Sequence, residues 1–200
     1  MCEELVSRPI ELPSGELRVL QPSESAGLPD DGAVEWAPLA PYWSVLWRSG
    51  VALARELDGE PLHGLRVVEL GCGLALPSIA AARAGAVVLA TDECAEALEL
   101  AARNAAANRV ELETAVVDWT APGELLERAP FDLALAADVL YERPNVAVLL
   151  ELLPRLAPEA WLADPGRPAA GAFMEQAERR GWEPDTRERG VVQIHRLKPA

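Results

Sequence analysis

Apolar and polar positions alternate near the start of the chain. Residues 8–12 and 16–20 show this alternation on either side of Pro13-Ser14-Gly15, a composition typical of a hairpin turn. The pattern predicts a small antiparallel β-ribbon. Residues 21–42 are rich in Pro, Gly, Asp and Ser and have no usable period, so we expect them to form a long loop.

Beyond residue 42, short apolar runs alternate with segments of helical period. The apolar runs are residues 65–70, 86–90, 110–117, 131–137 and 160–163, and the helical segments are residues 44–57, 77–84, 95–107, 145–156 and 169–180. This alternation predicts an α/β fold with a mostly parallel, Rossmann-like sheet and helices on both faces. Residues 182–186 and 191–197 follow without a strong intervening helix, so they predict an antiparallel hairpin at the edge of a seven-stranded sheet.

The chain has 200 residues, half of them hydrophobic, which is enough for one sizeable core. We expect residues 1–40 to form the ribbon and loop, and residues 41–200 to form a single domain. No apolar run approaches the roughly 18 residues of a membrane span, and the first residues lack the basic flank of a secretory signal. These features predict a cytoplasmic protein that does not associate with membranes. We also expect a monomer.

The formal net charge is -14, from 32 acidic and 18 basic residues. Sequence-independent binding of nucleic acid depends on Lys and Arg side chains that neutralise phosphates, so nucleic acid is a poor candidate partner. Cys2, Cys72 and Cys94 are widely spaced and form no Cys-x-x-Cys pair, so neither a disulfide framework nor a metal site is expected.

The first two strands of the predicted parallel sheet end in residues that are suited to binding a ligand. In such sheets, ligands bind beyond the carboxyl ends of the strands. The first strand leads from Glu69 into Gly71-Cys72-Gly73, where two glycines permit a tight turn and close approach of the backbone to a ligand. The second ends in Asp92, about 20 residues further on, where a carboxylate can accept hydrogen bonds from both hydroxyls of a ribose. Together they predict a nucleoside site.

Further residues near the ends of the strands indicate what kind of nucleoside the site binds. Leu76 and Pro77 stand where a dinucleotide fingerprint needs its last glycine, so a pyrophosphate site for NAD is not expected. The third strand ends in Asp118-Trp119, a carboxylate able to accept from an adenine amino group, beside a ring able to cover the base. The fourth ends in Asp138-Val139-Leu140-Tyr141, an acid with a phenol nearby.

At these residues the chain resembles the class I, seven-β-strand methyltransferases, which use S-adenosylmethionine. Residues 67–73 are similar to the first motif of that class. The segments that resemble the lysine methyltransferase family 16 branch, especially the electron-transfer-flavoprotein β-subunit lysine methyltransferases, are Pro41-Tyr42-Trp43, Trp47, Asp138-x-x-Tyr141 and Asp164-Pro165-Gly166-Arg167-Pro168. The similarity runs from about Pro41 to Trp182, so the resemblance implies a methyltransferase domain over residues 41–200.

The resemblance also implies roles for individual residues. The positions that match cofactor contacts are Trp47, Gly71, Cys72, Gly73, Asp92, Trp119 and Ala137, to which we add Glu69 and Asp118. Asp138 and Tyr141 match the acid-x-x-aromatic motif near the transferred methyl group. Ala75 departs from the pattern, because many members have a third glycine there, and its methyl group is expected to tighten the approach to the amino-acid end of the cofactor.

Plainer interpretations apply to several of these residues. Trp43 is equally well explained by packing of the first helix against the sheet, and residues 164–168 have the composition of a rigid turn. His63 and His195 have no acid or nucleophile at motif spacing and are predicted to be structural. Cys72 supplies backbone to the turn and is not expected to act as a nucleophile.

The predicted reaction is transfer of a methyl group from S-adenosylmethionine to a protein lysine. Such a transfer requires a neutral nucleophile held in line with the departing sulfur, and no covalent intermediate with the enzyme. Asp138 is expected to orient the amine, and Tyr141 to wall or hydrogen-bond it. No feature of the sequence fixes the size of the acceptor, so a small-molecule N-methyltransferase and a non-catalytic nucleoside-binding module remain as alternatives.

Overall fold

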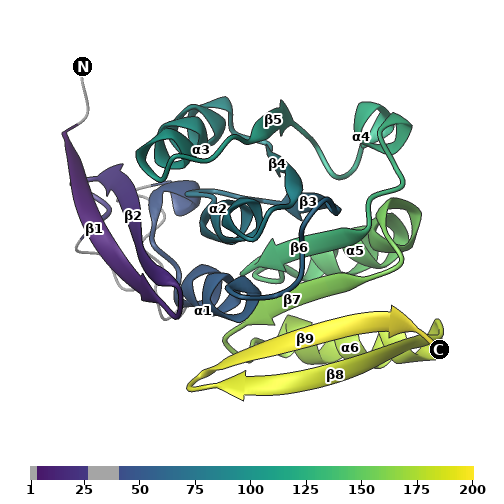
Figure 1. Cartoon of the computed structure of the whole chain (residues 1–200). Coiled ribbons are helices and arrows are strands. Elements are labelled where there is room, and N and C mark those ends of the chain that lie inside the picture. The colour runs from purple at the N-terminus through teal and green to yellow at the C-terminus, as the bar shows by residue number, and fades with distance from the viewer. Residues whose placement is uncertain (1–3, 27–40) are drawn as a thin grey trace.

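The computed structural model describes residues 4–26 and 41–200. The predicted ribbon is present as β1 (Leu5–Leu12) and β2 (Gly15–Pro22), which pair in antiparallel register (Figure 1). The loop was predicted to begin at residue 21. That boundary was wrong, because Gln21 and Pro22 pair with Val6 and Leu5 and so belong to β2. Residues 27–40 of the predicted loop lie outside the described residues.

The main sheet has seven strands in the order β5-β4-β3-β6-β7-β9-β8. They are β3 (Arg66–Leu70), β4 (Val87–Asp92), β5 (Glu113–Val116), β6 (Leu133–Ala137), β7 (Ala160–Asp164), β8 (Trp182–Arg189) and β9 (Val192–Pro199). Strands β3 to β7 are parallel, whereas β9 runs antiparallel to β7 and pairs with β8 as an edge hairpin. The predicted Rossmann-like sheet is confirmed.

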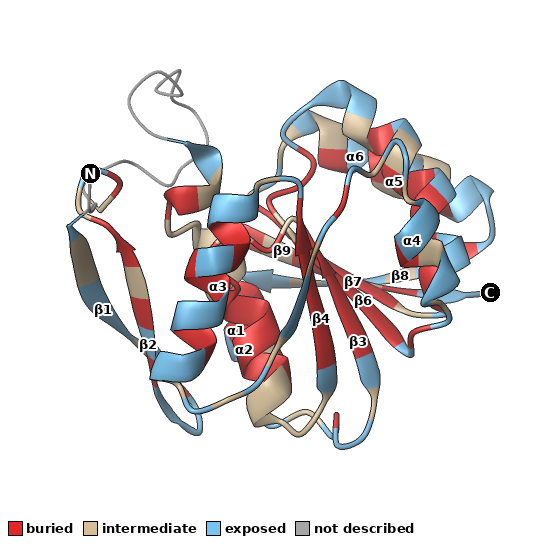
Figure 2. Ribbon diagram, turned by 90° about the horizontal axis from the view of Figure 1, so that it is seen from above, coloured by how far each residue is buried: buried red, intermediate tan, exposed pale blue. Residues whose placement is uncertain are grey.

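Helices cover both faces of this sheet, as Figure 2 shows. They are α1 (Arg48–Leu57), α2 (Leu76–Arg83), α3 (Ala95–Ala107), α4 (Gly123–Glu127), α5 (Arg143–Leu156) and α6 (Pro168–Arg179). The first three helices and the ribbon share one buried apolar cluster, and the last three form a second cluster on the opposite face. None of the helices among the described residues is long and apolar enough to cross a membrane.

Two elements begin three or more residues later than expected, and one helix was not expected. Helix α1 begins at Arg48 instead of residue 44, because Tyr42–Ser44 form a 3-10 turn and Trp47 has an extended backbone. Strand β5 begins at Glu113 instead of residue 110, since the backbone N–H of Val110 still donates to a carbonyl of α3. Helix α4 was not predicted, because five residues are too few to show a helical period.

The ribbon is attached to α3 by two asparagine side chains. The amide of Asn108 accepts from the backbone N–H of Arg18 at 2.8 Å and donates to its carbonyl at 2.6 Å. One turn earlier, Asn104 does the same with Leu20, at 2.7 and 3.2 Å. Both amides therefore replace the backbone partners that a third strand would give to β2.

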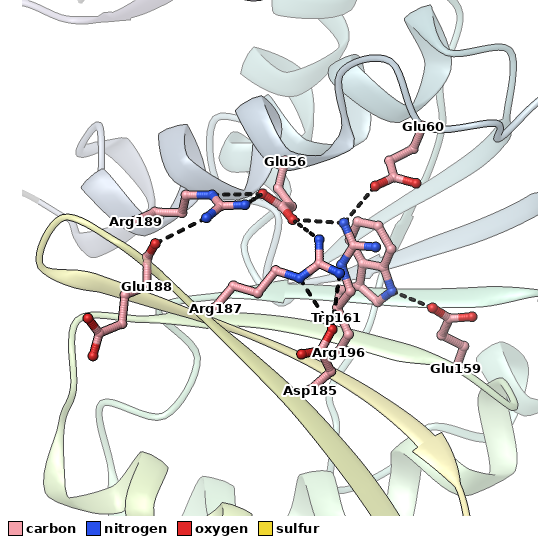
Figure 3. Close-up of polar contacts among 9 residues, drawn as sticks. All are labelled: Glu56, Glu60, Glu159, Trp161, Asp185, Arg187, Glu188, Arg189 and Arg196. Carbon is pink, nitrogen blue, oxygen red and sulfur yellow. Dashed lines mark hydrogen bonds and ion pairs between the residues drawn. The ribbon is translucent and has the colours of Figure 1, made fainter.

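The C-terminal hairpin is attached to α1 by a cluster of arginines around Glu56 (Figure 3). The carboxylate of Glu56 accepts hydrogen bonds from Arg187, Arg189 and Arg196, at 2.8 to 3.1 Å. Burial alone would raise the pKa of Glu56, but the hydrogen bonds from Arg189 and Arg196 outweigh burial and lower it. Arg196 also stacks on Trp161, 3.7 Å from the ring centroid.

Candidate active site

A cavity of about 570 Å³ lies at the carboxyl ends of β3, β4 and β6 and beside the segment after β5. This is the edge of an open α/β sheet at which ligands bind. Every residue predicted for the site lines this cavity, namely Trp47, Glu69, Gly71, Cys72, Gly73, Asp92, Asp118, Trp119, Ala137, Asp138 and Tyr141. The fold therefore brings together residues that are separated by up to about ninety positions along the chain.

The glycine turn after β3 leaves no space for side chains. Gly71 and Gly73 have φ angles of +65° and +48°, in the left-handed region that favours glycine. A Cβ atom at Gly71 would lie 3.1 Å from the ring of Trp119, and one at Gly73 would lie 2.9 Å from the carbonyl oxygen of Trp43. Ala75 has a φ of +61° and caps α2, but it is not among the residues that line the cavity.

Asp92 connects the ends of β3 and β4. Its carboxylate accepts hydrogen bonds from the backbone N–H of Gly73 at 2.9 Å and from that of Cys94 at 3.0 Å. Burial raises the pKa of Asp92 even though these bonds favour the ionised form. The carboxylate is therefore held in a fixed orientation at the cavity wall, in the place predicted for a ribose contact.

Glu69 is a deeply buried acid at this edge, with 1% of its surface exposed. Its Oε2 atom accepts hydrogen bonds from the backbone N–H and the hydroxyl of Ser78 in α2. Burial raises its pKa to about 8, and the nearby Asp92 acts in the same direction. Burial also raises the pKa of the neighbouring Cys72 thiol, so this thiol is protonated at neutral pH.

Asp118 and Trp119 line the cavity from the segment after β5. The Oδ1 atom of Asp118 accepts from the hydroxyl and the backbone N–H of Thr120, both at 2.7 Å, and these bonds lower its pKa. The Trp119 ring packs against the Gly71 backbone. Its indole Nε1 is buried without a hydrogen-bond partner among the described residues. The segment therefore offers an ionised acid beside an aromatic face.

Asp138 lies directly after β6, with a φ of +57° and only 7% of its surface exposed. Its Oδ1 atom accepts a hydrogen bond from Nη2 of Arg167 at 2.5 Å. Arg167 also pairs with Asp164, whose carboxylate accepts the backbone N–H groups of Gly166 and Arg167. The Oδ2 atom of Asp138 is buried and has no partner in the part of the chain that the structure describes.

Two aromatic rings form the exposed rim of the cavity. Tyr42 and Tyr141 are 44% and 46% exposed, and their ring centroids are 5.8 Å apart. Tyr42 also contacts Trp47, whose indole N–H donates to the Tyr42 carbonyl at 3.0 Å. Burial raises the pKa of Tyr141, and the charges of Glu142 and Glu93 raise it further, so its phenol is protonated at neutral pH.

Arg167 and Tyr42 line the cavity but were not among the predicted site residues. The sequence placed Arg167 in a segment with the composition of a rigid turn, and the bonds from Gly166 and Arg167 to Asp164 confirm that turn. The signal for Arg167 was its position after a strand that ends at the site. Tyr42 lies six residues before α1 and was considered only as part of the resemblance.

Carboxylates dominate the described lining of the cavity. They come from Asp92, Glu93, Asp118, Asp138 and Glu142, whereas Arg167 is the one basic residue among the described lining residues. Glu69 also lines the cavity, but its pKa of about 8 leaves it mostly protonated at neutral pH. Such a lining favours ligands that carry positive charge. A nucleotide with phosphates is disfavoured, and a cationic nucleoside or an amine is favoured.

Residues 42–161 match the family model described as lysine methyltransferase. The chain belongs to this family. S-Adenosylmethionine, the cofactor predicted from the sequence, is the methyl donor that membership of the family implies. The predicted relation to the class I methyltransferases is thereby confirmed.

Two relatives with sequences similar to this chain are named for different methyltransferase activities. The electron transfer flavoprotein beta subunit lysine methyltransferase of Xenopus laevis is 32% identical over 140 residues, which cover 66% of this chain and 55% of the relative. The histone-arginine methyltransferase METTL23 of Xenopus laevis is 32% identical over 128 residues, which cover 57% of this chain and 54% of the relative. The chain thus matches only about half the length of each.

The fold is shared with a solved methyltransferase. The ribosomal protein L11 methylase of Lactobacillus delbrueckii superimposes with a TM-score of 0.62 and 20% identity, over 76% of this chain and 78% of that chain. At this level of identity the likeness concerns the fold, which agrees with the strand order of the main sheet.

Proposed function

We propose that the protein transfers the methyl group of S-adenosylmethionine to the Nζ atom of a lysine in a protein substrate. The observation that supports this best is that one acidic cavity joins the glycine turn and Asp92 at one end to Asp138 and the Tyr42–Tyr141 rim at the other. A volume of about 570 Å³ falls within the range of about 300 to 1,000 Å³ typical of ligand pockets.

The residues of the donor half fit a cationic nucleoside. Asp92 is held at the carboxyl end of β4 by two backbone N–H groups and would accept the ribose hydroxyls. Trp119 would cover the adenine ring, and Asp118 would accept its amino group. Gly71 and Gly73 keep the turn free of side chains, so a ligand can approach the backbone closely.

The acceptor half positions an amine. Asp138 has one carboxylate oxygen bonded to Arg167, and its other oxygen lacks a partner among the described groups. That second oxygen would accept a hydrogen bond from the lysine Nζ. The protonated phenol of Tyr141 and the ring of Tyr42 would flank the aliphatic stem and the cationic head of the side chain.

The acceptor lysine must lose a proton before transfer, since its ammonium has an ordinary pKa of about 10.4. When bound, the cofactor supplies an electrophilic methyl group, so that a C–S bond breaks and an N–C bond forms. The positive charge of the bound cofactor would disfavour an ammonium beside it, and the proton would leave to solvent through the exposed rim that Tyr42 and Tyr141 form. Catalysis then depends on alignment of the Nζ atom with the methyl carbon.

We further propose a cytoplasmic monomer that acts on protein and not on nucleic acid. The net charge of -14 supports the choice of partner, because phosphates would be repelled. The free thiols of Cys72 and Cys94 fit a reducing compartment. The division into residues 1–40 and residues 41–200 also stays a prediction.

The test is incubation of the purified protein with a cell lysate and S-adenosylmethionine labelled in its methyl group. Protein and small-molecule fractions are counted separately, and labelled protein is hydrolysed to identify the methylated amino acid. Label in methyl-lysine supports the proposal. Label confined to small amines favours a small-molecule N-methyltransferase. Label in methyl-arginine contradicts lysine as the acceptor. No transfer despite cofactor binding favours a non-catalytic nucleoside-binding module.

A further inference from the structure

A second cavity, of about 570 Å³, lies between the ribbon, α1 and the turn that joins β8 to β9. Figure 1 shows these three elements on the same side of the molecule. Four arginines line this cavity, namely Arg8, Arg48, Arg55 and Arg189, and its described lining contains no Asp or Glu. In a chain with 32 acidic and 18 basic residues, this concentration of positive charge is unexpected. We call it the arginine groove.

Among the described residues, no carboxylate pairs with Arg8 or Arg55 of the arginine groove. Arg8 donates to the backbone carbonyl of Ala26, and Arg55 donates to that of Glu11 at 3.0 Å, so neither of these two bonds supplies a carboxylate. Arg189 does pair with a carboxylate, Glu56, but Glu56 also pairs with two further arginines of the hairpin (Figure 3). The groove therefore favours a ligand with negative charge.

A second feature indicates what kind of anion fits. Gln21 lines the groove with 1% of its surface exposed, and its Oε1 atom has no hydrogen-bond partner within the described parts of the chain. A buried acceptor of this kind requires an N–H or O–H donor. An acidic peptide offers both carboxylates for the arginines and backbone N–H groups for Gln21. The backbone of DNA offers anions without such donors.

The arginine groove lies next to the active-site cavity. Leu46 lines both cavities. Asp164 pairs with Gln193, so the β8–β9 turn lies at the carboxyl end of β7, the same edge of the sheet as the active site. A substrate that spans the two cavities would thus contact an acidic cavity with one part and the basic groove beside it with another.

We propose that the arginine groove binds an acidic segment of the protein substrate, next to the lysine that enters the active-site cavity. This inference rests on the proposed function, since it assigns the class of substrate to that site. Electrostatic complementarity would orient the substrate, with its lysine toward the carboxylates and its acidic segment toward the arginines.

The test measures binding of a fluorescein-labelled hexaglutamate peptide by fluorescence anisotropy at low salt. The double variant Arg8→Glu/Arg55→Glu should raise the Kd about tenfold or more, since charge-assisted hydrogen bonds are replaced by repulsion. The double variant Arg8→Lys/Arg55→Lys keeps the charge and should restore most of the binding. The double variant Arg155→Glu/Arg179→Glu on α5 and α6 makes an equal charge change on the opposite face and should alter the Kd less than twofold.

Three results would overturn the inference: no binding by the unaltered protein, an equal Kd in the charge-reversed variant, or equal competition by an oligothymidylate of the same charge. Affinity for S-adenosylhomocysteine, measured in each variant, distinguishes loss of the groove from loss of folding. If the peptide binds through the arginines but the lysate assay shows no methyl transfer, the groove is supported and the proposed activity is contradicted.

Discussion

The side chains of Asp138 and Arg167 meet inside the active-site cavity, where Arg167 Nη2 donates to Asp138 Oδ1 at 2.5 Å. Both side chains are largely buried, with exposed fractions of 7% and 16%. Arg167 therefore compensates much of the charge of Asp138 and fixes the direction of its second oxygen. In the proposed reaction, Asp138 acts on the amine through the orientation of that oxygen as well as through its charge.

The variant Asp138→Asn should separate cofactor binding from turnover. An amide keeps the shape of the carboxylate, but it loses the negative charge that favours an amine and weakens the pairing with Arg167. We expect S-adenosylhomocysteine affinity within a few fold of the original and a turnover reduced at least about tenfold. Calorimetry and steady-state kinetics on the identified acceptor measure the two effects. Lost cofactor binding with normal turnover at saturating cofactor would place Asp138 on the adenosine side.

The variant Asp92→Ala should weaken cofactor binding. A hydrogen bond to a charged group contributes about 1.5 to 3 kcal/mol, which corresponds to roughly a 10- to 150-fold increase in the Kd. Removal of the carboxylate also leaves the backbone N–H groups of Gly73 and Cys94 without the acceptor to which they now donate. Titration with S-adenosylhomocysteine gives the Kd, and a thermal melt shows whether the variant is folded. An unchanged Kd in a folded variant would remove Asp92 from the site.

Glu69 should make the stability of the cofactor-free protein depend on pH. Its pKa is about 8 in the folded protein against 4.5 when exposed, so the folded state binds the extra proton between these values. Its contribution to stability is fully present below pH 4.5 and is lost as the pH rises through about 8, with a slope of at most about 1.4 kcal/mol per pH unit.

The variant Glu69→Gln removes this titration and should flatten the decline in Tm between pH 6 and 8. The control Glu99→Gln, at an exposed position of α3, should leave the decline unchanged. Thermal denaturation at each pH tests the assignment. An identical decline in the original protein and in Glu69→Gln would show that another group is responsible.

Two glycine substitutions should have opposite effects on stability. In Gly73→Ala, the new Cβ would lie 2.9 Å from the Trp43 carbonyl oxygen and the residue would keep a left-handed φ, so we expect a loss of about 1 to 3 kcal/mol. Gly171 lies within α6 with no atom near its would-be Cβ, so Gly171→Ala should gain about 0.5 to 1 kcal/mol. Denaturant unfolding gives both values, and equal effects would contradict the crowding at Gly73.

Most of the fold was predictable because the parallel strands β3 to β7 are short apolar runs between helical segments. The boundaries that were wrong depend on tertiary contacts. Trp47 is extended before α1, and its indole N–H donates to Tyr42, whereas the residues after α3 stay bonded to that helix before β5 begins. The pairing of Gln21 and Pro22 with β1 extends the ribbon into a segment whose composition is that of a loop.

The site was predictable where one strand end carries one residue, as at Asp92 and Asp138. It was not predictable where the structure adds a partner from elsewhere. Arg167 reaches Asp138 from 29 positions further along the chain, and Tyr42 meets Tyr141 from the other side of the cavity. Neither pairing leaves a period or a spacing in the sequence. Family resemblance indicated the segments that contain Arg167 and Tyr42 without indicating these contacts.

The arginine groove takes two of its four arginines from segments near the two ends of the chain. Arg8 lies in the first strand and Arg189 at the turn into the last, both outside residues 42–161, the segment that matches the family model. All residues predicted to contact the cofactor lie inside that segment. With the groove in its proposed role, substitutions of Arg8 or Arg189 would alter the choice of protein partner and leave the donor site intact.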